Sequence, residues 1–306
     1  MRRPPLPSRV RIVEVGPRDG LQNERAPIDT ATKVALVDAL TAAGLPVIEV
    51  GAFVSPRWVP QMADTADVFQ SIKRAPGIAY TALVPNTIGL RRAIAAGVTE
   101  VAVFAAASET FSARNISQTV EESLKAYADV AREALESGLR VRAYLSTAFG
   151  CPYEGHVPVT RVVDVAVRLR DLGAYEVAVS DTIGVAHPGQ VWDVLAALDS
   201  RLLISEIALH LHDTRGTALA NVLAGLQAGV TTFDTSAGGL GGCPYAPGAA
   251  GNLATEDLVS MLDGLEVGTG VDLAQVVRAS SLIEPHLGHS LPSRYVQAVR
   301  RGELRS

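Results

Sequence analysis

Two histidines that stand two positions apart are the first residues whose type and spacing could do chemistry. His210 and His212 lie in the segment IALHLHDTRG, residues 207–216. Side chains alternate between the two faces of a strand, so both imidazoles would lie on one face, with Leu211 on the other. Buried imidazoles need polar partners, and one shared cation would satisfy both. The pair therefore has two interpretations, a metal site or two hydrogen-bonded histidines in a core.

Charged side chains stand at the ends of other β-branched runs. Arg18 and Asp19 follow RIVEVG, Glu49 lies in VIEVGA, and Asp181 ends YEVAVSD. Each has a structural alternative. The sequence PRDG around Arg18 is rich in turn formers and could be a surface turn. Glu49 could end a strand at the rim, although its alternation with Val47 indicates an inward carboxylate that needs a partner. Asp181 could simply cap a following helix.

One carboxylate and two imidazoles form a set that suits a divalent cation. Asp19, His210 and His212 could bind Mg²⁺, Mn²⁺ or Zn²⁺ and leave positions open for substrate and water. The chain has only two cysteines, Cys151 and Cys243, which are too few for a structural zinc site.

A glycine-rich segment, GGLGGCPYAPGAAGN, covers residues 238–252 and contains six glycines. It could be a connector, but so many glycines indicate a mobile lid or a close backbone approach to a ligand. Cys243 lies in its middle and is either an inert small side chain or a reactive thiol over the open end of the fold.

The elements that must position these residues repeat along the chain. Eight β-branched runs alternate with helical patterns, such as the one that begins after Asp29 and stops at Gly44. The runs are RIVEVG at 11, VIEVGA at 47, IAYTALV at 78, EVAVFA at 100, RVRAYLS at 140, YEVAVSD at 175, IALHLHD at 207 and TTFDTSA at 231.

Strands that alternate with helices predict a parallel sheet, and eight such units predict an α/β fold of the (β/α)₈ TIM-barrel type. Its catalytic residues should stand at the carboxyl ends of several strands, where the candidates above are found. The alternative is a doubly wound open sheet, which fits less well because GPRDGLQ stands where that fold has G-x-G-x-x-G.

The domain organisation follows from the same pattern. No Pro- or Ser-rich linker divides the chain, so we expect one domain over residues 1–306. Residues 1–9 have no apolar region of a secretory signal and are expected to be a disordered lead-in. Residues 255–306 lack further strand runs and are expected to form additional C-terminal helices.

Composition limits the function classes. The chain has 306 residues, of which 48% are hydrophobic and 19% charged, with a net charge of -5 and a pI near 5.7. This favours a compact enzyme and argues against a nucleic-acid partner, which needs a clustered positive surface. No apolar run approaches the roughly 18 residues of a membrane span, and the low cysteine count favours a reducing cytoplasm.

Six segments together resemble a known family in the order in which they occur. They are VEVGPRDGLQNE (13–24), FVSPRWVPQMAD (53–64), GCPYEG (150–155), SDTIG (180–184), HLHDTRGTALAN (210–221) and GGLGGCPYAPGAAGNLATEDLV (238–259). They are similar to the 3-hydroxy-3-methylglutaryl-CoA (HMG-CoA) lyases, which belong to the metal-dependent TIM-barrel lyases and Claisen condensing enzymes. The similarity runs from about residue 10 to residue 300, and the loop with the cysteine is specific to the lyases.

The resemblance implies a role for each matching residue. It places metal ligands at Asp19, His210, His212 and Asn252, with Mg²⁺ or Mn²⁺ as the ion. It places a catalytic arginine at Arg18, a supporting acid at Glu49 and a loop cysteine at Cys243. It also implies an acyl-CoA thioester as substrate and a homodimer.

The implied reaction splits HMG-CoA into acetyl-CoA and acetoacetate, as in leucine degradation or ketone-body formation. A divalent cation would stabilise the substrate alkoxide, and Arg18 the enolate oxygen. Asp19 or His210 would accept the hydroxyl proton, and Cys243 or His210 would reprotonate the carbon.

Two departures from the family bear on the substrate. Ala52 and Ala178 stand where serines are expected, so a related ester, citramalyl-CoA or a longer 3-substituted glutaryl-CoA, is an alternative substrate. A condensing synthase of the isopropylmalate type is another alternative, although such enzymes usually carry a further region. A catalytically inactive binding barrel is a third, and the full set of proposed ligands argues against it.

Overall fold

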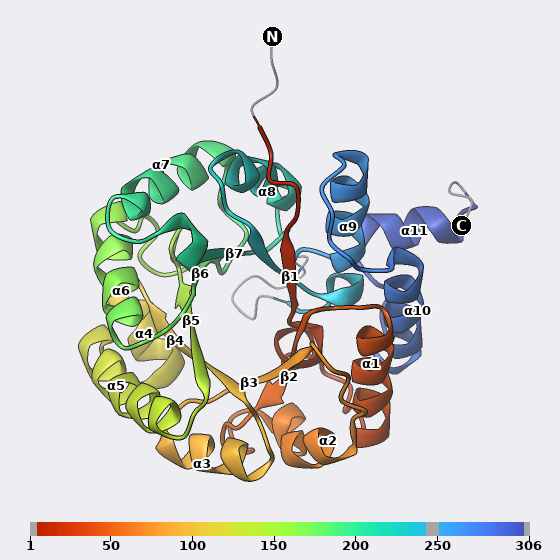
Figure 1. The fold of residues 1–306 in the computed structure, drawn as a ribbon, viewed down its shortest axis with the longest axis horizontal. Helices are drawn as coiled ribbons and strands as arrows, with labels where there is room; N and C mark the ends of the chain where they lie inside the picture. Colours follow the sequence, from red (N-terminus) through yellow and green to blue (C-terminus); the bar gives the residue numbers. More distant parts are fainter. Residues whose placement is uncertain (1–4, 243–250, 303–306) are drawn as a thin grey trace.

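The computed structural model describes residues 5–242 and 251–302. Eight parallel strands form one closed barrel, in which each strand pairs with the next and β8 pairs with β1 (Figure 1). The strands are β1 Arg11–Glu14, β2 Val47–Ala52, β3 Ala79–Leu83, β4 Glu100–Ala106, β5 Arg140–Ser146, β6 Val177–Asp181, β7 Ile207–Leu211 and β8 Thr232–Thr235. The predicted (β/α)₈ barrel is confirmed, and the open-sheet alternative is wrong because the sheet has no edge between β8 and β1.

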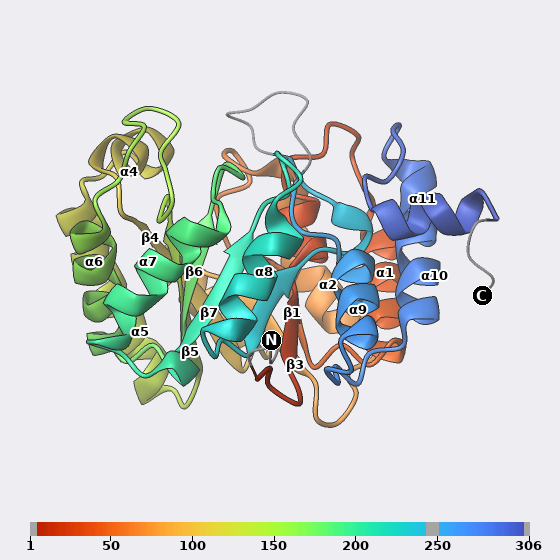
Figure 2. The ribbon, with the colours of Figure 1, turned by 90° about the horizontal axis from the view of Figure 1, so that it is seen from above.

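Helices surround the barrel and cover the outer face of the sheet (Figures 1 and 2). They are α1 Thr30–Ala42, α2 Thr65–Ser71, α3 Thr87–Ala95, α4 Glu109–Ile116, α5 Val120–Glu136, α6 Val159–Asp171, α7 Pro188–Asp199 and α8 Ala218–Gln227. Because both faces of a parallel barrel sheet are covered, its strands are apolar runs rather than alternating ones, and all six residues of β2 are buried.

Short helical turns join several of these elements. They are η1 Gly16–Gly20, η2 Pro60–Met62, η3 Ile204–Glu206, η4 Ala237–Gly239 and η5 Glu284–His286. The turn η1 is π-helical and follows β1 after a single residue, Val15, at the carboxyl end of the barrel.

Three more helices follow the barrel, α9 Thr255–Gly264, α10 Leu273–Ile283 and α11 Arg294–Arg300. They lie along one side, where α10 packs against α1 (Figure 2). Buried polar contacts tie this segment to the first strand, since the Thr255 hydroxyl donates to Glu14 Oε2 at 2.6 Å. The C-terminal segment is thereby fixed to the first strand of the barrel.

The chain ahead of β1 is ordered closer to the N-terminus than expected. Gly268 N–H donates to the Ser8 carbonyl at 3.0 Å, and Arg9 forms a parallel bridge with Gly268. The expected disordered lead-in over residues 1–9 is therefore wrong at Ser8 and Arg9, because a backbone pairing with the segment after α9 holds them.

No helix in the described ranges is long and apolar enough to cross a membrane.

Candidate active site

Three predicted ligands from opposite ends of the sequence meet at the carboxyl end of the barrel. His210 lies in β7, His212 follows it directly, and Asp19 comes from η1. The Nε2 atoms of the two histidines are 3.3 Å apart, and each is 3.9 Å from Asp19 Oδ2. The two histidines are each 6% exposed. The alternating strand geometry and the closure of the barrel thus bring one carboxylate and two imidazoles to one point.

The electrostatics keep Asp19 and His212 in the forms that bind cations. Burial and the neighbouring His210 lower the pKa of His212 to about 4, so its imidazole is neutral at pH 7. Burial opposes ionisation of Asp19, but Arg18 and the two histidines outweigh it and lower the Asp19 pKa to about 2. Neutral imidazole and ionised carboxylate are the ligand states a divalent cation requires.

The short distance between the two ring nitrogens bears on whether these side chains suit a bound cation. Two unprotonated nitrogens at 3.3 Å repel unless a proton or a cation lies between them. Carboxylate and imidazole donors suit divalent metals that keep open coordination positions. The donor set of Asp19, His210 and His212 therefore fits a divalent cation.

Asn252, the fourth predicted ligand, lies beside this cluster. It forms an antiparallel bridge with His212, and its Nδ2 donates to Asp19 Oδ2 at 2.9 Å and to the Leu240 carbonyl at 3.1 Å. The amide nitrogen rather than the amide oxygen thus faces Asp19, and here Asn252 holds the carboxylate in place.

Two glycines explain how the chain closes around Asn252. A side chain on Gly251 would meet the carbonyl oxygen of Gly241 at 1.8 Å, and Gly241 has a φ of +108° that other residues rarely adopt. The glycines at the two ends of this loop therefore permit a close backbone approach. Cys243 lies outside the described residues.

Arg18 is held between two carboxylates. Its Nε donates to Glu49 Oε2 and its Nη1 to Asp19 Oδ1, both at 2.5 Å, and its guanidinium lies 5.2 Å from the centre of the Tyr144 ring. Arg18 is 6% exposed, so PRDG is not a surface turn. It forms η1 instead, and π-helical turns are frequent at functional sites.

Arg18 stays protonated and positively charged in its buried position. Desolvation opposes it, but the carboxylates of Glu49 and Asp19 raise the Arg18 pKa above its usual value. Burial raises the pKa of the Glu49 carboxyl, and the contact with Arg18 acts in the opposite direction. A register irregularity between Glu49 and Gly51 in the pairing of β2 with β3 accompanies this inward placement of Glu49.

The expected helix-capping role of Asp181 is wrong, because the N-cap residue of the next helix, α7, is His187. The two carboxylate oxygens of Asp181 accept from the backbone N–H groups of Val185 and Ala186, at 2.9 and 3.0 Å. The side chain therefore fixes the loop after β6. The two alanines that depart from the family, Ala52 and Ala178, are both buried at strand positions.

Sequence reasoning missed a second charged group inside the barrel. Asp234 in β8 accepts two hydrogen bonds from Arg142 in β5, at 2.7 and 3.1 Å, and Arg142 Nε donates to Glu176 at 2.7 Å. Tyr144 packs edge-on against His210, with ring centres 5.8 Å apart. The sequence does contain a signal for this buried group. Arg142 and Tyr144 lie on one face of the run RVRAYLS, and Asp234 interrupts an otherwise neutral strand run.

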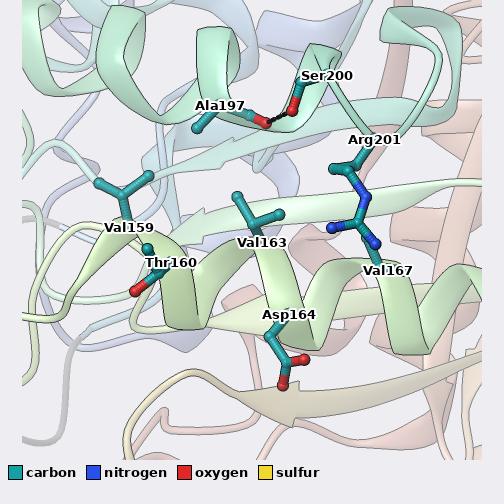
Figure 3. A pocket seen from close by; sticks show the side chains of 8 residues that line it. All are labelled: Val159, Thr160, Val163, Asp164, Val167, Ala197, Ser200 and Arg201. Atoms are coloured by element: carbon teal, nitrogen blue, oxygen red, sulfur yellow. Dashed lines mark hydrogen bonds between the residues drawn. The ribbon is translucent and has the colours of Figure 1, made fainter.

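A pocket of about 480 Å³ borders this region beside Asn252. The residues that line it include Asp213, Arg215 and Arg294. Another groove lies on the outside of the barrel between α6 and α7, where Val159 and Val163 face Ala197 and the Ser200 hydroxyl donates to the Ala197 carbonyl (Figure 3). That second groove is made from the outer helices and contains none of the site residues.

A closed parallel barrel with convergent acid, imidazole and guanidinium groups at the carboxyl ends of its strands is the arrangement of a barrel enzyme. Residues 9–283 match the family model described as HMGL-like, and the chain belongs to this family. The resemblance predicted from the sequence is confirmed.

Individual relatives agree with this assignment. The chain is 50% identical over 293 residues to the mitochondrial hydroxymethylglutaryl-CoA lyase of Rattus norvegicus, covering 96% of this chain and 90% of the relative. It is 51% identical to the 3-hydroxy-3-isohexenylglutaryl-CoA/hydroxy-methylglutaryl-CoA lyase of Pseudomonas aeruginosa, covering 96% and 98%. A structure of an HMG-CoA lyase from Acinetobacter baumannii with coenzyme A and 3-methylmalate has a TM-score of 0.92 at 36% identity, covering 98% of each chain.

Proposed function

We propose that this chain is a carbon–carbon lyase that cleaves HMG-CoA to acetyl-CoA and acetoacetate. Relatives that are named as HMG-CoA lyases match nearly the whole chain at about 50% identity. The observation that carries the proposal is the convergence of Asp19, His210, His212 and Arg18 at one end of the barrel. A condensing synthase is not favoured by the named relatives. For the alternative of a related ester, the Pseudomonas aeruginosa relative is named for 3-hydroxy-3-isohexenylglutaryl-CoA as well as for HMG-CoA.

The reaction is balanced without a co-reactant. The bond between the hydroxyl-bearing carbon and the methylene next to the thioester breaks, and the hydroxyl oxygen becomes the ketone of acetoacetate. The hydroxyl proton is removed, and a proton is added to the methylene carbon, which becomes the methyl of acetyl-CoA. The site must therefore accept one proton, stabilise an enolate oxygen and deliver one proton.

We propose Asp19, His210, His212 and Asn252 as the residues that hold a divalent cation, Mg²⁺ or Mn²⁺. Such an ion supplies positive charge that makes the substrate hydroxyl more acidic. Asp19 and His212 already offer the ionised and neutral forms that binding needs. The Asn252 amide would contribute its oxygen, which requires a different amide orientation from the one described above.

Arg18 is proposed as the donor to the enolate oxygen. Its Nε and Nη1 are engaged by Glu49 and Asp19, while its Nη2 donates no hydrogen bond to any described residue. A guanidinium fixed on two sides with one nitrogen unused is preorganised to stabilise developing negative charge. Glu49 is proposed to hold Arg18 in this orientation.

The pKa values of the site residues bear on which of them accepts the proton of the substrate hydroxyl. Asp19, with a pKa of about 2, and His212, with a pKa of about 4, are weak proton acceptors at neutral pH. His210, the other proposed base, would act through Nε2, and only in a state in which that nitrogen does not hold the cation. Cys243 remains a proposed proton donor to the enolate carbon.

The organisation of the protein is proposed as follows. The chain acts as a homodimer in the cytoplasm, as one domain over residues 1–306, with an acyl-CoA thioester as its substrate. Analytical ultracentrifugation of the full chain tests the dimer, since sedimentation as a single species of 32.1 kDa would contradict it.

The function is tested by incubating metal-free protein with HMG-CoA and Mg²⁺ or Mn²⁺ and measuring acetoacetate and acetyl-CoA. Equal amounts of the two products are expected, and excess chelator should abolish them. Full turnover in chelator, with no metal in the protein, would contradict the metal-dependent mechanism. Absence of acetoacetate under all metal conditions would contradict the lyase assignment.

A further inference from the structure

A buried carboxylate lies directly beneath the candidate metal site. His210 in β7 and Asp234 in β8 are paired in register, so their side chains extend from neighbouring strands on the same face of the sheet. His210 Nδ1 lies 3.2 Å from Asp234 Oδ2, on the opposite side of the ring from the nitrogen that faces Asp19 and His212. Asp234 is 2% exposed, so its ionised form needs a positive partner.

Arg142 is that partner, and it fixes the direction of the carboxylate. Its Nη2 donates to Asp234 Oδ1 at 2.7 Å and its Nη1 to Asp234 Oδ2 at 3.1 Å. Its Nε donates to Glu176, which also pairs with Arg11 near the other end of the barrel. A planar guanidinium bound at both edges holds the carboxylate in one orientation.

The charge state of Asp234 sets the proton position on His210. Arg142 donates to both oxygens of Asp234, and this two-point contact with a guanidinium is the pairing of an ionised carboxylate. An ionised carboxylate can only accept, so Nδ1 of His210 must donate to it. A neutral His210 ring then carries its lone pair on Nε2, which points toward Asp19 and His212.

His212 provides an internal contrast. Its Nδ1 is buried and has no hydrogen-bond partner among the described residues, and no carboxylate supports that side of its ring. Of the two imidazoles, only His210 is oriented from behind by a carboxylate. Such an outer-shell contact fixes the tautomer and ring direction of a metal-binding histidine.

We infer that Asp234, held by Arg142, is a positioning residue that fixes the ring orientation and the Nδ1–H tautomer of His210. Asp234 itself does not reach the substrate. The inference rests on the proposed function, because the lone pair on His210 Nε2 matters only if that nitrogen binds a cation or accepts a proton.

The first measurement uses the metal-free wild-type protein. Long-range ¹⁵N–¹H correlation spectra report which nitrogen of each histidine carries the proton, and the signals of His210 are assigned by their loss in His210→Gln. We expect the Nδ1–H tautomer for His210. An Nε2–H tautomer would overturn the inference, whatever the behaviour of any variant.

The second measurement compares two Asp→Asn variants. Asp234→Asn removes the obligate acceptor, and Asp64→Asn removes a carboxylate from another ion pair, with the 5%-exposed Lys33 outside the barrel. We expect Asp234→Asn to lose the single tautomer and to bind Mn²⁺ about 10- to 100-fold more weakly, the range for outer-shell partners. Asp64→Asn should keep both properties.

A folded Asp234→Asn protein with wild-type tautomer and Mn²⁺ affinity would overturn the inference, as would an equal loss in Asp64→Asn. If Asp234→Asn does not fold, the wild-type spectrum still decides. Failure of the proposed function is separately visible, as wild-type protein that neither binds Mn²⁺ nor forms acetoacetate.

Discussion

Arg18 and Arg142 are both buried near the Tyr144 ring, at 5.2 and 5.1 Å from its centre, and each contacts two carboxylates. They differ in how completely they are paired. Arg142 uses Nε, Nη1 and Nη2. Arg18 leaves Nη2 without a partner in the described part of the chain, and its acid Glu49 leaves Oε1 unpaired.

This difference indicates that the Arg142 cluster supports the structure, whereas the Arg18 cluster is available to a substrate. A buried ion pair whose hydrogen bonds are all satisfied holds its neighbours in place and has nothing left to offer a ligand. The Arg18 cluster, at the carboxyl end of the barrel, keeps polar atoms unsatisfied where a substrate would lie. Unsatisfied buried polar groups are costly, so they are expected where a ligand completes them.

The largest effect on stability is expected from Arg142→Gln. The change leaves Asp234 and Glu176 buried without their shared cation, and breaking such a pair costs about 3–5 kcal/mol. Urea unfolding of the variant and the wild type at pH 7 measures the difference. A loss below about 1 kcal/mol would show that the Arg142 cluster does not support the barrel.

Arg18→Gln should instead act on the rate. Losing one donor to a developing oxyanion lowers turnover by roughly a hundredfold, while Glu49 can respond by taking up a proton. Steady-state rates with HMG-CoA and the same urea unfolding are the paired measurements. The comparison fails if Arg18→Gln loses more stability than Arg142→Gln and keeps its turnover.

Glu49→Gln should have a smaller effect. The amide oxygen can still accept from Arg18 Nε, so the substitution replaces a charge-assisted hydrogen bond by a neutral one, a difference of about 1 kcal/mol. Turnover should fall about fivefold. A loss as large as that of Arg18→Gln would mean that Glu49 takes part in proton transfer rather than in orientation.

Two buried acids that pair with no arginine among the described residues extend this comparison. Glu14 and Glu256 lie near the loop after β8 and accept from Ala237 N–H and Gly238 N–H. Burial raises the pKa of Glu14 to about 7 and that of Glu256 to about 8, against the hydrogen bonds they accept. Asp19 and Asp234, which lie beside arginines, have lowered pKa values, whereas burial still raises the pKa of Glu49 beside Arg18.

These raised values predict a pH dependence of stability. Between about pH 4.5 and 8 the folded chain retains the Glu256 proton that the unfolded chain has lost, so this group makes stability fall as pH rises. Glu256→Gln removes that contribution. Its melting temperature relative to the wild type should therefore be more favourable at pH 8.5 than at pH 5.5, and a difference independent of pH would contradict the assignment.

The sequence was sufficient for the parts that depend on local patterns. Seven of the eight predicted runs contain the observed strand, as TTFDTSA contains Thr232–Thr235, and β4 extends one residue beyond its run, because buried parallel strands are short apolar runs between helix signals. The placement of His210 and His212 on one face followed from side-chain alternation alone.

The other features of the site depend on long-range contacts, which cannot be predicted from a local sequence pattern. The π-helical turn at Arg18 is stabilised by its long-range pairing with Glu49, and PRDG alone is better suited to a surface turn. The Arg142–Asp234 pair joins β5 to β8 across the barrel interior, so only the closed fold reveals it.

The central claim is that Asp19, His210 and His212 hold one divalent cation at the mouth of the barrel. Electron paramagnetic resonance titration of metal-free protein with Mn²⁺ tests it without turnover. His212→Ala removes one proposed ligand, and the control His156→Ala removes an exposed histidine outside the site. We expect one bound Mn²⁺ per chain in the wild type and in His156→Ala, and affinity lowered more than about a hundredfold in His212→Ala, beyond the range for outer-shell partners. Equal Mn²⁺ affinity in all three proteins, or no bound Mn²⁺ in the wild type, would contradict the claim.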